Sequence, residues 1–107
     1  MGKVSDLQVA QKLISIKTSA DNRGIEFDMS LKKVRTLLNT KKCYISGEKL
    51  NDIQNDPNKL TFDRVDNSKG YTDDNVKACS LRMNRLKDSL SFEDIRLLYI
   101  AMRKVNK

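Results

Sequence analysis

The sequence contains no histidine and no tryptophan, a single proline, and two cysteines among 107 residues. Without histidine, imidazole can serve neither as a general base nor as a metal ligand. No apolar run approaches the roughly 20 residues that a bilayer-spanning helix needs, and residues 1–6 lead into a polar amphipathic segment rather than a secretory signal. These absences predict a soluble, cytoplasmic chain without a membrane partner.

The cysteines, Cys43 and Cys79, are too few for a disulfide framework. In a chain without a secretory signal, the default expectation is two reduced, buried thiols. A closed structural zinc site needs four ligands, and only carboxylates could complete one here. Structural zinc is therefore not expected.

Positive charge is in excess, with 21 lysines and arginines against 14 acidic residues and a net charge of +7. Such an excess favours polyanionic partners, because neutralising phosphates releases condensed counterions. The length is that of one modest domain. The composition thus predicts a single domain over residues 1–107 that has a thin core and a basic surface.

Two helices are predicted in the first part of the chain. Ser5 and Gln8 form a capping-box pattern before an apolar stripe, which predicts a helix over residues 6–17. Ser30 can cap a second helix that ends near Thr40. Residues 1–40 therefore read as a helical N-terminal part.

The pattern changes after residue 42. Residues 43–47 form a short strand-like run, and residues 60–65 alternate apolar and polar side chains as a strand does. Residues 66–70 are a dense turn signal, and residues 76–79 predict a second strand. A helical segment over residues 81–87 follows.

A last helix is predicted after Ser91, within residues 89–107. Its apolar positions share one face, which predicts a face buried in the core; they are Phe92, Ile95, Leu98, Tyr99 and Met102. The whole pattern predicts an α+β fold in which a hairpin and a helix, in residues 43–88, are flanked by helices on both sides.

An ordered set of residues in this central part resembles the HNH, or ββα-metal, endonuclease family, in particular its small bacteriophage members. The set is Cys43-x-x-Ser46-Gly47, Leu60-Thr61-Phe62-Asp63-Arg64-Val65-Asp66-Asn67, Gly70-Tyr71, Asn75-Val76, Cys79, Asn84 and Lys87. The similarity extends over residues 20–105. It implies a hairpin and a helix that hold one divalent metal against a scissile phosphate.

The resemblance assigns roles to individual positions. Asp63 and Asn84 correspond to the metal ligands, and Asn75 corresponds to the asparagine that orients the catalytic loop. Magnesium, or manganese in its place, suits such oxygen ligands. Arg64 stands where the family has its general-base histidine, and a guanidinium cannot accept a proton but can clamp a phosphate. The proton would then go to Asp66 or to a metal-bound hydroxide.

Two further inferences come from this block. The paired Cys-x-x-Cys motifs of many members are reduced here to Cys43 and Cys79, which the resemblance places close together. Basic residues concentrate around the motif and are expected to form a phosphate-binding surface; they are Arg64, Lys69, Lys77, Arg82, Arg85 and Lys87.

Three functions follow from the sequence. The first is a metal-dependent endonuclease of phage or mobile-element type that hydrolyses phosphodiester bonds in DNA. The second is a catalytically silent descendant that binds DNA or RNA through the same basic surface. The third is an accessory protein that binds a host protein. The retained Asp63, Asn75 and Asn84 favour the first, and the missing histidine favours the other two.

Overall fold

The protein is represented by a computed structural model that describes residues 3–106. These residues form an α+β fold, as the sequence predicts. Its elements are α1 (Asp6–Asn22), β1 (Phe27–Asp28), α2 (Leu31–Leu38), β2 (Leu60–Arg64), β3 (Tyr71–Thr72), β4 (Val76–Ser80), α3 (Leu81–Asp88) and α4 (Phe92–Val105).

The centre of the fold is an antiparallel hairpin made of β2 and β4, in which Asp63 is paired with Lys77. The segment between these strands carries β3, which pairs in parallel with β1. Gly70 makes this second pairing feasible, since a Cβ atom there would lie 2.5 Å from the carbonyl oxygen of Glu26. The predicted strands at 60–65 and 76–79 and the predicted turn between them are confirmed.

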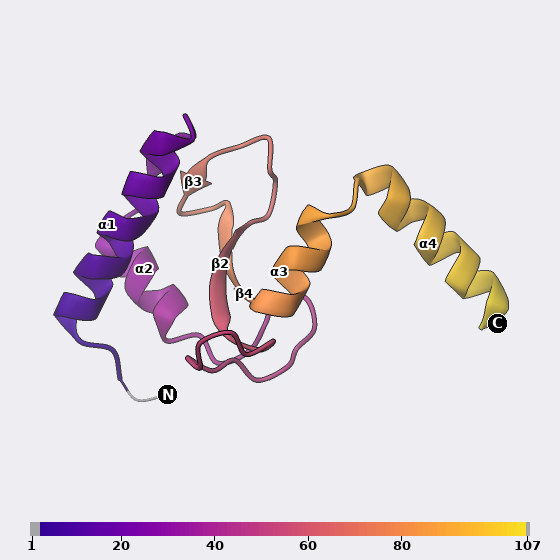
Figure 1. Cartoon of the computed structure of the whole chain (residues 1–107), viewed down its shortest axis with the longest axis horizontal. Coiled ribbons are helices and arrows are strands. Elements are labelled where there is room, and N and C mark those ends of the chain that lie inside the picture. The colour runs from indigo at the N-terminus through magenta and orange to yellow at the C-terminus, as the bar shows by residue number, and fades with distance from the viewer. Residues whose placement is uncertain (1–2, 107) are drawn as a thin grey trace.

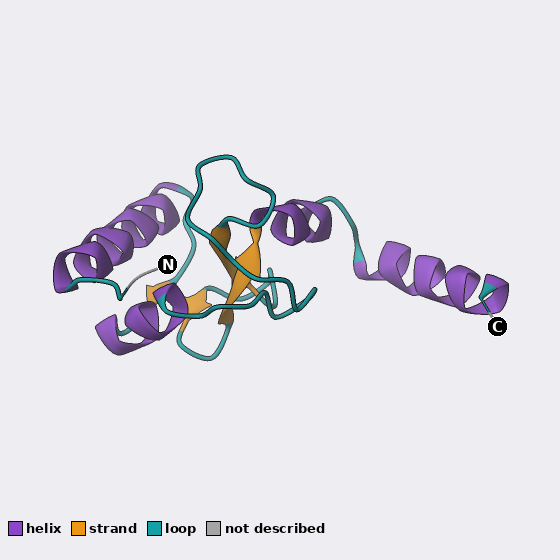
Figure 2. Ribbon diagram, turned by 90° about the horizontal axis from the view of Figure 1, so that it is seen from below, coloured by secondary structure: helices purple, strands orange, loops and turns teal. Residues whose placement is uncertain are grey.

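The hairpin separates two groups of helices (Figures 1 and 2): α1 and α2 lie on one side of it, and α3 lies on the other. Alternation along the strands explains this arrangement, because successive side chains point to opposite faces. Leu60, Val76 and Ala78 are buried with Val9 and Val34 of the first two helices. The thin core therefore lies mainly between α1, α2 and the hairpin.

The first helix is longer than its polar second half suggests. It was predicted to end at residue 17 but continues to Asn22, because Ile16 and Ala20 lie one turn apart and are both buried. The predicted strand at residues 43–47 is wrong. This segment is a turn, in which Gly47 has a φ of +74° and donates a hydrogen bond to the Cys43 carbonyl.

The prediction for the last helix is also partly wrong. The helix forms, but α4 extends away from the hairpin and helices (Figure 1), and its apolar side chains are not buried. Phe92 is 85% exposed and Met102 is 52% exposed. Periodicity identified the apolar face correctly, but no described element covers it. In residues 3–106 no helix is long and apolar enough to cross a membrane.

Candidate functional site

A cavity of about 380 Å³ lies beside the hairpin, between α3 and the C-terminal end of α1. Its lining includes Arg23, Asp63, Arg64, Asn67, Tyr71 and Asn84. The cavity therefore brings together three residues that the sequence singled out, Asp63, Arg64 and Asn84. It also includes Tyr71, which belongs to the motif without an assigned role, and Arg23, which lies outside the motif.

Asp63 is the most buried charged group of this site, with 2% of its surface exposed. The Tyr44 hydroxyl donates a hydrogen bond to its Oδ2 atom at 2.5 Å, and the Lys87 ammonium lies 3.3 Å from the carboxylate. Lys87 also donates to the Arg64 carbonyl at 2.8 Å. Burial, followed by the hydrogen bond to Asp63, raises the pKa of Tyr44. The carboxylate is thus charge-balanced and hydrogen-bonded within the protein.

Asn84 faces the same strand from α3. Its side-chain nitrogen donates to Thr61 Oγ1 at 2.9 Å and approaches the Phe62 carbonyl at 3.4 Å. Together with Lys87 it satisfies backbone carbonyls on the edge of β2 that does not face β4. This explains a polar residue in the middle of a short helix, where asparagine has a lower helix propensity than alanine.

The arrangement does not fit a resident divalent cation. A hard cation prefers several oxygen ligands, ideally anionic ones. The cavity is lined by two carboxylates, the buried Asp63, whose charge Lys87 already balances, and the exposed Asp88, and by the side-chain amide of Asn84, which donates to Thr61. Within residues 3–106 no three carboxylates or thiolates are grouped so that they could share a metal ion.

Two guanidinium groups meet at Tyr71 on the rim of the cavity. Arg23, the C-cap of α1, donates to the Tyr71 hydroxyl at 3.3 Å, and the Arg64 guanidinium lies over the Tyr71 ring at 5.3 Å. Arg64 also donates to the carbonyls of Asn67 and Lys69. Neither arginine forms an ion pair with another residue of the 3–106 region. Both positive charges remain available to an anion.

Asn75 holds the loop between β2 and β3. It is buried, accepts a hydrogen bond from the Asp66 amide at 3.0 Å, and donates to the carbonyls of Asp66 and Gly70. These contacts fix the backbone of the loop at both Asp66 and Gly70. Asp66 itself caps a turn through Ser68, whose hydroxyl and amide lower the pKa of the Asp66 carboxyl. It does not line the Asp63 cavity but a neighbouring one with Phe92 and Ile95.

The predicted basic surface is divided. Of its members only Arg64 lines the cavity, and Lys87 is engaged with Asp63. Arg82 forms an ion pair with Glu48 at 2.6 Å. Lys69, Lys77 and Arg85 are exposed and lie outside the lining of the cavity.

The two cysteines are neighbours, with their sulfur atoms 3.8 Å apart and both side chains buried. Burial alone would raise the pKa of Cys43, but hydrogen bonds from the Ser46 hydroxyl and nearby backbone groups lower it to about 6. Burial and the adjacent Cys43 raise the pKa of Cys79 to about 12.

Sequence reasoning missed Arg23 and Tyr44. Each contacts its partner across a long stretch of chain, since Arg23 reaches Tyr71 and Tyr44 reaches Asp63. The Arg23-Gly24 pair indicates only the end of a helix. An available signal was the helical spacing of Lys12, Ser19 and Arg23, which places them along one face of α1.

Comparison with known proteins shows that the chain is similar in sequence to two viral proteins. It is 27% identical over 88 residues to the "Uncharacterized 29.0 kDa protein in dda-modA intergenic region" of Enterobacteria phage T4, covering 82% of this chain and 35% of that protein. It is 32% identical over 92 residues to "Uncharacterized protein R423" of Acanthamoeba polyphaga mimivirus, covering 84% of this chain and 16% of that protein. The matched part thus corresponds to 35% of the length of the phage protein and to 16% of the length of the mimivirus protein. No family model and no solved structure matches it.

Proposed function

We propose that this domain is an HNH-derived module that binds nucleic acid through the cavity beside β2, without turnover. The observation that carries the proposal is the convergence of Arg23 and Arg64, both free of ion pairs with described residues, on one cavity. Guanidinium groups match the geometry of phosphate oxygens and stay charged at any physiological pH. The net charge of +7 adds a long-range attraction.

The state of Asp63 supports binding over catalysis. Lys87 forms an ion pair with the Asp63 carboxylate, and Tyr44 donates a hydrogen bond to it. Arg64 stands at the motif position where a nuclease of this family has its general base, and arginine cannot accept a proton. The similarity to phage and giant-virus proteins agrees with a phage-type origin. We extend the proposal to DNA as the partner, with RNA as the alternative that the experiment compares.

Fluorescence anisotropy with labelled DNA and RNA oligonucleotides over a salt series tests this function. We expect the logarithm of the affinity to fall linearly with the logarithm of salt concentration. Arg23→Gln should weaken binding by about tenfold, since a charge-assisted contact contributes roughly 1.5 kcal/mol. Arg103→Gln removes the same charge from exposed α4 and is the matched control. A salt-independent affinity, or equal effects of the two variants, would remove the proposal.

Metal-dependent hydrolysis of DNA is the second candidate, because Asp63 and Asn84 line the same cavity. Cleavage with magnesium or manganese would require Lys87 to leave the carboxylate. A plasmid-nicking assay with either metal, with a chelator control, decides between the candidates. The double variant Asp63→Asn, Lys87→Met replaces the ion pair by uncharged groups of similar size and is the informative control. Metal-dependent nicking by the parent that this variant lacks would establish the nuclease.

A further inference from the structure

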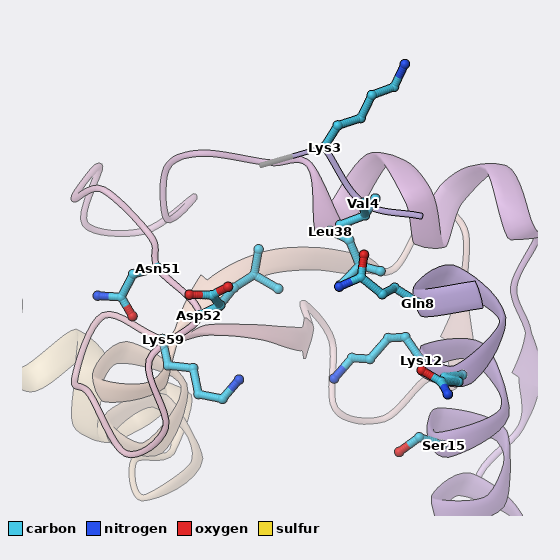
Figure 3. Close-up of a pocket in the computed structure, with 11 residues that line it drawn as sticks. Lys3, Val4, Gln8, Lys12, Ser15, Leu38, Asn51, Asp52 and Lys59 are labelled. Atoms are coloured by element: carbon cyan, nitrogen blue, oxygen red, sulfur yellow. The ribbon is translucent and has the colours of Figure 1, made fainter. Parts of the chain in front are cut away.

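A larger cavity, of about 540 Å³, lies between α1 and the segment that leads into β2. Figure 3 shows Lys12 of α1 and Lys59, next to the start of β2, extending their ammonium groups into the space between these elements. A smaller cavity of about 290 Å³ shares Lys12 and Lys59 with it, and shares Phe62 and Tyr71 with the Asp63 cavity. The three cavities are therefore neighbours along β2, and we refer to this row of cavities as the α1–β2 groove.

One polar face of α1 forms a wall of this groove along its whole length. Its residues follow helical spacing and are Gln8, Lys12, Ser15, Ser19 and Arg23. Leu60 and Phe62 of β2 contribute apolar surface opposite this wall. Hydroxyl, amide and cationic groups near the Phe62 ring suit a ligand that has a phosphate backbone and flat bases.

Lys12 and Lys59 lie where the larger and the smaller cavity meet, and they do not line the Asp63 cavity. Neither forms an ion pair with a residue in the 3–106 region, although Asp52 also lines this cavity. Lys12 is partly buried, with its ammonium 4.9 Å from the centre of the Phe62 ring. Burial, and then repulsion from Lys59, lower the pKa of Lys12. An anion placed between the two ammonium groups would relieve this repulsion.

We propose that a single strand of nucleic acid lies along the α1–β2 groove, with one backbone phosphate between Lys12 and Lys59 and another at Arg23 and Arg64. This inference rests on the proposed nucleic-acid binding and adds the path of the strand and the positions of two phosphate contacts. Lys12 and Arg23 are eleven residues apart on α1, a rise of about 16 Å. That rise corresponds to about five stacked nucleotides at the B-form spacing of 3.4 Å per strand.

The test is the salt dependence of affinity for oligodeoxythymidine of two and of eight nucleotides. For the longer oligonucleotide, Lys12→Gln with Lys59→Gln should reduce the slope of log affinity against log salt by about 0.7, the contribution of the one single-strand phosphate that lies between the two lysines. Lys41→Gln with Lys42→Gln removes the same charge from exposed positions outside the groove and should leave the slope unchanged. The dinucleotide is too short to contact both phosphate positions. For this ligand, the double variant should reduce the slope by no more than half of that amount.

The outcomes separate this inference from the function on which it rests. If the parent protein shows no salt-dependent affinity, the proposed function fails. If Arg23→Gln weakens binding but the Lys12 and Lys59 variant behaves like the Lys41 and Lys42 control, only the groove path is overturned. An equal loss of slope for both oligonucleotide lengths overturns it as well, because it indicates a pocket for a free phosphate group. Circular dichroism and urea unfolding of each variant establish that it is folded.

Discussion

The Lys87 ammonium lies 3.3 Å from the carboxylate of Asp63, which is almost completely buried. Lys87 comes from α3 and Asp63 from β2, so the ion pair attaches the helix to the hairpin. Tyr44 adds a hydrogen bond from the turn that precedes the hairpin. A residue that resembles a metal ligand in sequence therefore joins three segments of the fold.

Removing the lysine should expose the structural role of this pair. Lys87→Met leaves a buried carboxylate with only the Tyr44 hydroxyl as partner. Breaking a buried ion pair on one side costs about 3 kcal/mol of unfolding free energy. Urea unfolding at neutral pH measures the loss.

Arg82→Met is the matched control. Arg82 lies on the same helix as Lys87, and its ion pair with Glu48 is exposed. Exposed pairs contribute below about 1 kcal/mol. If the Lys87 and Arg82 variants lose equal stability, the Asp63–Lys87 contact is not a structural anchor.

Gly70 should tolerate no side chain. A Cβ atom would lie 2.5 Å from the Glu26 carbonyl oxygen and 2.6 Å from the Glu26 Cβ, so β1 and β3 would have to separate. Gly70→Ala should therefore cost about 2 kcal/mol of unfolding free energy, as overpacking does. It should also remove the hydrogen-exchange protection of the Tyr71 amide, which donates to Glu26.

Gly24→Ala serves as the comparison, since a Cβ there meets nothing within 4 Å and is disfavoured only by a φ of +67°. This variant should lose stability but keep the Tyr71 amide protected. A protected Tyr71 amide in Gly70→Ala would contradict the close approach.

The local parts of the fold were predictable from sequence because each carries its own signal. Alternating side chains identified β2, residues 76–79 were expected as the strand after the turn and form part of β4, and Ser5 and Ser30 marked the starts of α1 and α2. The pairing of β1 with β3 gave no such signal, because two-residue strands are too short to show a period. It depends instead on tertiary contacts at Gly70 and Tyr71.

The candidate site was predictable only in part, for the same physical reason. The motif order brought Asp63, Arg64 and Asn84 to one cavity. It did not reveal that Lys87 would pair with the Asp63 carboxylate and Tyr44 would donate a hydrogen bond to it. It also did not reveal that Arg23 and Arg64 would both contact Tyr71. These contacts join residues that are distant in the chain, and neither periodicity nor local motifs specify them.

The two cysteines should form an internal disulfide when the folded protein is exposed to oxidised glutathione. The Cys43 thiolate, with a pKa of about 6, attacks glutathione disulfide and releases one glutathione; Cys79 then displaces the second. The pKa of about 12 for Cys79 should make the second step slow. Intact mass should show the loss of two hydrogen atoms, and the first step should slow as the pH falls below 6.

Cys79→Ser stops the reaction after the first step and should accumulate the mixed disulfide of Cys43 with glutathione. Sulfur atoms 3.8 Å apart must approach to about 2.05 Å, so only a small movement is needed. A parent protein that forms only the mixed disulfide would show that the two side chains do not meet in solution.

Helix α4 should be dispensable for the stability of the rest of the domain. Its apolar side chains are exposed, and it extends away from the hairpin (Figure 2), so it contributes little burial to the core. A chain that ends at Leu90 should keep its unfolding free energy within about 1 kcal/mol, because hydrophobic stabilisation scales with the apolar area removed from water. The protected amides of β2 and β4 should remain protected in hydrogen exchange, and the shortened chain should bind less of a hydrophobic dye. Phe92→Ser in the full chain is the matched point variant and should likewise leave stability unchanged. A loss of several kcal/mol in either variant would mean that the α4 face packs against the domain in solution.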